Sequence, residues 1–94
     1  MLSTKNLAPK VVSELLRDQP LSPEKVRFAW RVTVGNSMAR ATSVKLEENG
    51  TLVVYAEGDH WRRETTRSAR VIKQRLSTLL GGNIVRRVRV KVRT

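Results

Sequence analysis

The sequence contains no cysteine and only one histidine, His60. The absence of cysteine excludes disulfide bonds, thiolate metal sites and cysteine nucleophiles, and it fits a reducing compartment. A single histidine among scattered carboxylates does not supply the converging ligands that a metal site needs. We therefore expect no metal, no other cofactor and no enzymatic activity.

Long apolar runs are missing as well. No stretch approaches the roughly 18–20 apolar residues of a membrane-spanning helix, and the first six residues lack the apolar segment of a signal peptide. No internal repeat and no low-complexity stretch is present. A chain of 94 residues has the size of one domain. We expect a soluble cytoplasmic protein, associated with the nucleoid if its ligand is DNA.

Acidic residues are scarce: eight Asp and Glu stand against 19 Lys and Arg, which gives a net charge of +11 and a pI near 11.5. Residues 1–57 carry eight basic and six acidic side chains, or +2, whereas residues 58–94 carry eleven and two, or +9. Such clustering is typical of nucleic-acid binding, because neutralising phosphates releases counterions. An anionic membrane surface would attract the same charge, but no exposed bulky apolar residues back the basic segment.

Helical patterns occupy the first part of the chain. Leu7, Val11 and Leu15 recur four residues apart and predict a short helix over residues 8–18. Ser22 followed by Pro23 is a helix start signal, and a second helix is expected over residues 23–41. Gly35 weakens the middle of this helix by about 1 kcal/mol relative to alanine. It is expected to mark a kink or a close helix contact.

Strand patterns and a third helix follow. Alternating side chains around Asn49-Gly50 predict a hairpin with strands over residues 43–48 and 51–57. One long helix is expected over residues 59–80, with Asp59 as its cap and Gly81 as a left-handed C-terminal glycine. A last strand is expected over residues 84–93. The order α-α-β-β-α-β predicts an α+β fold in which helices cover one face of a small sheet and the other face meets water.

Two rows of cations stand out in this arrangement. Arg63, Arg67 and Arg70 fall on one helical stripe, where like charges four apart weaken the helix and only Glu64 is expected to offset them. The final strand places basic side chains on one face, about 6.5–7 Å apart. Tyr55 on the hairpin offers a ring for base stacking. The complete predicted nucleic-acid site comprises Lys45, Tyr55, Arg62, Arg63, Arg67, Arg70, Lys73, Arg86, Arg87, Arg89, Lys91 and Arg93.

Several of these features have a structural alternative. Basic residues on an edge strand also prevent aggregation. Trp30 and Trp61 lie on apolar stripes, which favours core packing over base stacking. Asp59 and His60 resemble an acid–base pair, but a helix-capping turn explains them equally well. The N-terminal helix is expected either to pack on the domain or to dock on a partner.

From Ser22 onward the chain resembles the bacterial DciA-like family. The resemblance rests on Trp30-x-x-x-Val34-Gly35-x-x-Met38-Ala39, Leu46, Asn49-Gly50-Thr51-Leu52-Val53-Val54, Trp61, Leu76-x-x-Leu79-Leu80-Gly81, Ile84 and the closing valine-rich strand. It covers about 65–70 residues and divides the chain into an N-terminal helical segment and linker, residues 1–21, and a domain, residues 22–94. Thr65 departs from the pattern, because the family usually has an apolar residue there.

This resemblance implies a KH-like fold, with helices on a three-stranded sheet, and a protein that binds DNA and the bacterial replicative helicase during helicase loading. No GxxG loop is present, so the backbone clamp of KH domains is not expected. Single-stranded or tailed DNA is the expected ligand, and the replicative helicase is the expected partner. An RNA-binding KH-like module and a protein-interaction adaptor with a basic face remain alternatives.

Overall fold

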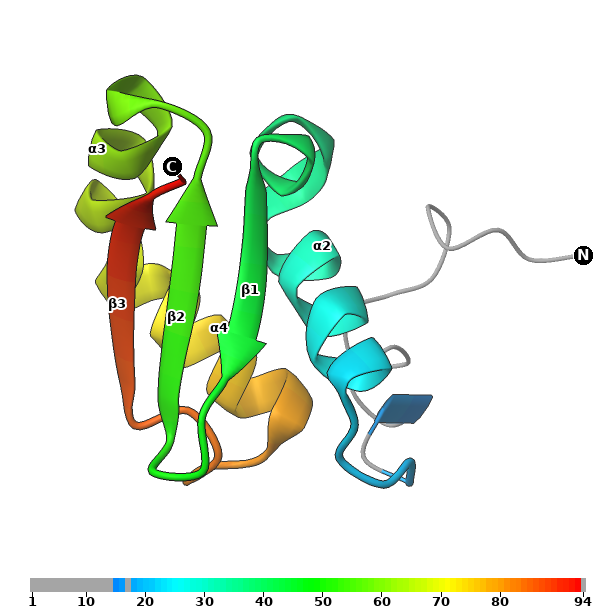
Figure 1. The fold of residues 1–94 in the computed structure, drawn as a ribbon. Helices are drawn as coiled ribbons and strands as arrows, with labels where there is room; N and C mark the ends of the chain where they lie inside the picture. The colour runs from blue at the N-terminus through cyan, green and yellow to red at the C-terminus, as the bar shows by residue number, and fades with distance from the viewer. Residues whose placement is uncertain (1–14, 17, 94) are drawn as a thin grey trace, which may run out of the picture.

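The computed structural model describes residues 15, 16 and 18–93. Most of the predicted N-terminal helix, residues 8–18, therefore lies outside the described residues. The elements follow one another along the chain as predicted, except that the third helix is two helices (Figure 1). They are α2 (Pro23–Arg40), β1 (Thr42–Leu46), β2 (Thr51–Ala56), α3 (Asp59–Arg67), α4 (Ala69–Leu80) and β3 (Arg87–Val92).

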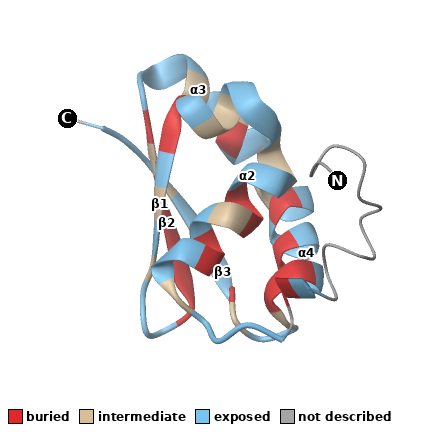
Figure 2. Ribbon diagram, turned by 90° about the vertical axis from the view of Figure 1, so that its right-hand side faces the viewer, coloured by how far each residue is buried: buried red, intermediate tan, exposed pale blue. Residues whose placement is uncertain are grey.

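The three strands form one mixed sheet in the order β1-β2-β3. β1 and β2 pair antiparallel through the predicted hairpin, whereas β2 and β3 pair parallel. Parallel neighbours need a long crossover, and α3 and α4 supply it. The helices all lie on one side of the sheet, α2 against β1 and α3 against β2 and β3 (Figures 1 and 2). The α+β, KH-like arrangement expected from the sequence is confirmed.

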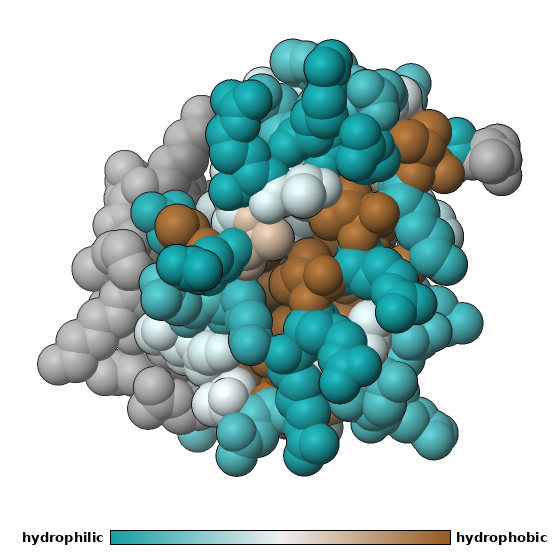
Figure 3. All heavy atoms as spheres, turned by 90° about the vertical axis from the view of Figure 1, so that its left-hand side faces the viewer, coloured by the Kyte–Doolittle hydropathy of each residue, from teal (hydrophilic) through white to brown (hydrophobic). Residues whose placement is uncertain are grey.

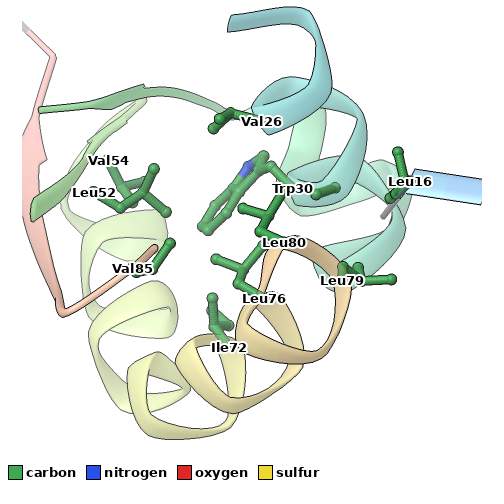
Figure 4. Packing of buried hydrophobic residues seen from close by; sticks show 11 residues of the cluster. Leu16, Val26, Trp30, Leu52, Val54, Ile72, Leu76, Leu79, Leu80 and Val85 are labelled. Atoms are coloured by element: carbon green, nitrogen blue, oxygen red, sulfur yellow. The ribbon is translucent and has the colours of Figure 1, made fainter. Parts of the chain in front are cut away.

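The core lies between this sheet and the helices. Leu52 and Val54 of β2 are fully buried and face Trp30 of α2 and Leu76 of α4 (Figure 4). Leu16 also belongs to the core, whereas Leu15, which the sequence placed on the apolar stripe of the N-terminal helix, is 56% exposed.

The start of α2 and its interruption agree with the sequence. Ser22 Oγ accepts a hydrogen bond of 3.1 Å from the Lys25 N–H, as an N-cap does. Gly35 has φ 83° and ψ 172°, a non-helical conformation inside the helix. A Cβ at Gly35 would meet no atom within 4 Å. The predicted kink is therefore confirmed, and a close helix contact is not the reason for the glycine.

The single helix expected over residues 59–80 is wrong. Ser68, with φ −95° and ψ 2°, separates α3 from α4. A straight helix of 22 residues would be about 33 Å long, far longer than a six-residue strand of about 20 Å. The break keeps α3 on β2 and β3 while α4 packs on α2.

The structure also differs from three predictions about where these elements begin and end. Gly58, not Asp59, is the residue before α3, and Asp59 makes no cap hydrogen bond. Gly81 has the positive φ expected of a C-terminal glycine, 112°, but its ψ of 151° lies outside the left-handed helical region. β3 begins at Arg87 instead of residue 84, because residues 82–84 form a turn and Val85 is drawn into the core.

Candidate nucleic-acid interface

The helix-free face of the sheet carries its cations around a buried valine. The strand register places Val53 of β2 between Lys45 of β1 and Arg89 of β3. Val53 is only 3% exposed although none of the described helices covers this face. Long basic side chains lay their aliphatic stems along apolar surface and keep their charged ends in water. The register places Lys45 and Arg89 where their stems can cover the valine in this way.

The next row of the same face contains the tyrosine. Tyr55 is half-buried between Ser43 of β1 and Lys91 of β3. Arg93 follows β3, and its Nη2 donates a hydrogen bond of 3.1 Å to Ser43 Oγ. This side chain therefore reaches from the end of β3 to β1, two strands away. The phenol ring of Tyr55 thus lies on this face with Lys91 and Arg93 nearby.

Among residues 15, 16 and 18–93, the acidic side chains of this face stand at its ends. Glu47 lies directly after β1, and Glu57 lies directly after β2. The ion pairs found in the described part of the chain all lie within single helices. The cations of the open face therefore have no carboxylate partner among the described residues, and an external anion can take that place. These cations are Lys45, Arg87, Arg89, Lys91 and Arg93.

The basic side chains predicted on the third helix, which we call the helix row, are partly neutralised by neighbouring carboxylates. Asp59 pairs with Arg62 at 2.8 Å and with Arg63 at 3.2 Å, and Glu64 pairs with Arg67 at 3.6 Å. The hydrogen bond from Arg62 and the charges of both arginines lower the pKa of the Asp59 carboxyl below its usual 3.8. The expectation that only Glu64 offsets this row is wrong, because α3 begins early enough to bring Asp59 under two arginines.

The break at Ser68 also divides the helix row. Arg63 and Arg67 belong to α3, whereas Arg70 and Lys73 belong to α4. All four side chains are exposed, but the stripe does not run along one continuous helix. Arg86 stands apart from both rows, since its side chain packs over Gly50, where a Cβ would lie 2.7 Å from Arg86 Cγ. The sheet row is thus the more continuous of the two predicted surfaces.

The remaining candidate residues have structural surroundings. Trp30 is buried, which confirms its predicted core position, and its Nε1 donates a hydrogen bond of 2.9 Å to Thr42 Oγ1. Trp61 is half-buried, and the His60 ring meets it edge-on at 5.3 Å. The Asp59 carboxylate is engaged by arginines, so Asp59 and His60 do not form the acid–base pair considered above.

Residues 15, 16 and 18–93 contain no group of three or more histidine, cysteine or acidic side chains placed to hold a metal ion. Within the same residues no helix has the length and apolarity to cross a membrane.

Sequence reasoning missed the burial of Val53 and the bond between Arg93 and Ser43. Alternation along β2 assigned Val53 to the polar face, correctly, but gave no sign that β2 is the central strand. The position of a strand within a sheet is set by pairing between distant segments. The uninterrupted apolar run Leu52-Val53-Val54 is a local signal of a strand buried on both faces, whereas no local pattern could have revealed the bond between Arg93 and Ser43.

Fold and surface together define a KH-like α+β module with a basic, helix-free sheet face. Residues 3–90 match the protein family described as "Dna[CI] antecedent, DciA". The chain belongs to this family, which has a role associated with the replicative helicase and its loading and is an accessory family rather than an enzyme family. The match extends to residues 3–21, which precede the residues that carry the resemblance described above. Searches of curated proteins and of solved structures returned no match.

Proposed function

We propose that this protein is a non-enzymatic accessory factor of the replicative helicase that binds single-stranded or tailed DNA in the bacterial cytoplasm, where it would associate with the nucleoid. Family membership supports the setting in replication. The observation that supports DNA binding is the row of cations around Tyr55 on the open sheet face, which have no carboxylate partner in the part of the chain that the structure describes.

The spacing of side chains on this face is compatible with an extended single strand. Alternate side chains of β3 stand about 6.5–7 Å apart, close to the spacing of successive phosphates in an extended strand. Tyr55 lies in the same face and offers a ring on which a base can stack without sequence preference. We place the main contact here and assign the partly neutralised helix row, Arg62, Arg63, Arg67, Arg70 and Lys73, a supporting role.

Salt dependence of oligonucleotide binding tests the proposal. If the five cations of the open face each neutralise one phosphate, log K should fall with log salt with a slope of about −3.5, or roughly 100-fold between 50 and 200 mM. Fluorescence anisotropy with a labelled single-stranded oligonucleotide measures this. Absence of binding at 50 mM salt would refute DNA binding.

A tyrosine variant separates stacking from charge. Tyr55→Leu keeps bulk and net charge, and loss of one stacked base should weaken binding by about 1–3 kcal/mol, since this is the usual contribution of base stacking. The salt slope should remain unchanged. Equal affinity of Tyr55→Leu and the parent protein would remove Tyr55 from the interface.

The RNA-binding alternative requires a separate experiment. RNA and DNA strands of one sequence should be competed against each other, because only RNA offers 2′-hydroxyls as contacts. Preference for RNA would favour the RNA-binding module. Retention of one partner protein after nuclease treatment, together with no affinity for either strand, would favour the adaptor.

A further inference from the structure

β3 presents one free backbone edge. The N–H of Arg87 donates to Gly50 O at 3.3 Å, and the N–H of Arg93 donates to Ala56 O at 2.7 Å. In a parallel pair, the residues that bond the neighbour alternate with residues whose groups point the other way. The backbone N–H and C=O groups of Val88, Val90 and Val92 therefore point away from β2. No strand of the described residues pairs with them.

Side chains along this edge alternate in chemistry. Val88 and Val90 are half-buried on the helix side, and Val92 is 39% exposed. Arg89 and Lys91 stand between them on the open face. Figure 3 looks onto this side of the molecule and shows apolar surface bordered by hydrophilic side chains. An incoming strand would thus find aliphatic contacts on one side and cations on the other.

The charge of β3 decides which strand can be added. Pairing with β3 of a second copy would set two rows of Arg and Lys against each other, and like charges on facing strands are destabilising. The same cations attract an acidic strand. Nucleic acid is a poorer occupant of the edge itself, because valines offer no ring for base stacking. The cations thus exclude self-pairing and favour one kind of partner.

We propose that the free edge of β3 binds an extended acidic segment of a partner protein by strand addition. The main chain of that segment hydrogen-bonds Val88 and Val90, its acidic side chains lie beside Arg89 and Lys91, and its alternate apolar side chains contact the valines. Strand addition of this kind takes its affinity from backbone hydrogen bonds and its specificity from alternate side chains. The proposal goes beyond DNA binding and stands without it.

Amide hydrogen exchange with a designed peptide tests this proposal on the full chain without DNA. The probe is an eight-residue peptide that alternates glutamate and valine, and its matched control has the same residues in two blocks. At ten times its Kd the alternating peptide should slow exchange at Val88 and Val90 about tenfold. Exchange at Arg89 and Lys91, whose amides bond β2, should hardly change. The block peptide should give little protection.

Two N-methylated peptides make the test specific for backbone pairing. Each carries methyl groups on one of the two alternating sets of N–H groups, so charge and side chains are identical. Only one set faces β3, and methylation of that set should abolish protection while methylation of the other preserves it. Equal binding of both peptides would overturn strand addition and leave charge attraction alone.

Proline variants locate the edge. Val90→Pro removes an outward N–H, a position at which an edge strand tolerates proline, and should abolish peptide binding. Val44→Pro makes the same change on β1, at the opposite edge of the sheet, where the backbone N–H of Val44 also points away from β2. This variant should leave peptide binding intact. Three results would refute the proposal: equal loss in both folded variants, protection of Val88 and Val90 by an oligonucleotide alone, or a dimer whose formation protects them.

Discussion

The indole N–H of Trp30 donates a hydrogen bond of 2.9 Å to Thr42 Oγ1, and the Thr42 hydroxyl in turn donates to the carbonyl of Met38 at 2.7 Å. These two hydrogen bonds connect the middle of α2, its last turn and the first residue of β1. Thr42→Val keeps the side-chain shape but leaves the buried indole N–H without an acceptor, which costs about 1–3 kcal/mol. Urea denaturation should show this loss, and an unchanged midpoint would mean that the hydrogen bond is dispensable.

Thr65 should respond in the opposite direction. This side chain is completely buried, and its Oγ1 has no hydrogen-bond partner among the described residues. Thr65→Val removes a buried hydroxyl whose burial without a partner costs about 1–3 kcal/mol, so the variant should be more stable by part of that amount. The same denaturation experiment compares the two threonines directly. Destabilisation by Thr65→Val would show that the hydroxyl is satisfied in solution.

Charge reversal should distinguish the sheet face from the rest of the basic surface. We expect Arg89→Glu with Lys91→Glu to weaken oligonucleotide binding far more than Lys5→Glu with Lys10→Glu. Both pairs change the net charge by the same amount, so a purely global attraction would affect them equally. Anisotropy at one low salt concentration measures the difference. Equal losses would remove the site from the sheet face.

The pKa of the Asp59 carboxyl should lie below the usual aspartate value. The hydrogen bond from Arg62, together with the charges of Arg62 and Arg63, lowers its pKa below 3.8. A lowered pKa in the folded state means that the ion pairs contribute to stability above the usual aspartate pKa and are lost as pH falls through the lowered value. NMR titration should place the midpoint below 3.8, and Arg62→Gln should raise it. An unchanged midpoint in that variant would contradict the assignment to Arg62.

Gly35→Ala tests whether the non-helical backbone at Gly35 outweighs the higher helix propensity of alanine. In a regular helix alanine would stabilise this position by about 1 kcal/mol. With φ 83° and ψ 172° the residue occupies a region reserved for glycine, where another residue costs about 1–3 kcal/mol. We therefore expect Gly35→Ala to lower the urea midpoint, whereas the exposed helical control Ser37→Ala should raise it slightly. A gain in stability for Gly35→Ala would show that the kink is not required.

Much of the fold was accessible from local patterns. The cap at Ser22, the turn at Asn49-Gly50 and the alternation of β3 depend on neighbours a few residues away, and each was confirmed. The site was predictable to a smaller extent. Alternation placed Lys45, Tyr55 and the β3 cations on a polar face, but DNA binding there stays a prediction, as does the division of the chain at residue 22.

Sequence by itself determined the order of the elements, the strong positive charge and its concentration after residue 57, because these are properties of the chain and of short-range periodicity. Only the tertiary structure decided that Ser68 interrupts the last helical segment, that β2 is central and buries Val53, and that Arg93 reaches Ser43. These features arise when segments distant in sequence share one sheet. Its short strands limit the helices above it, and its strand order decides which backbone edge remains free.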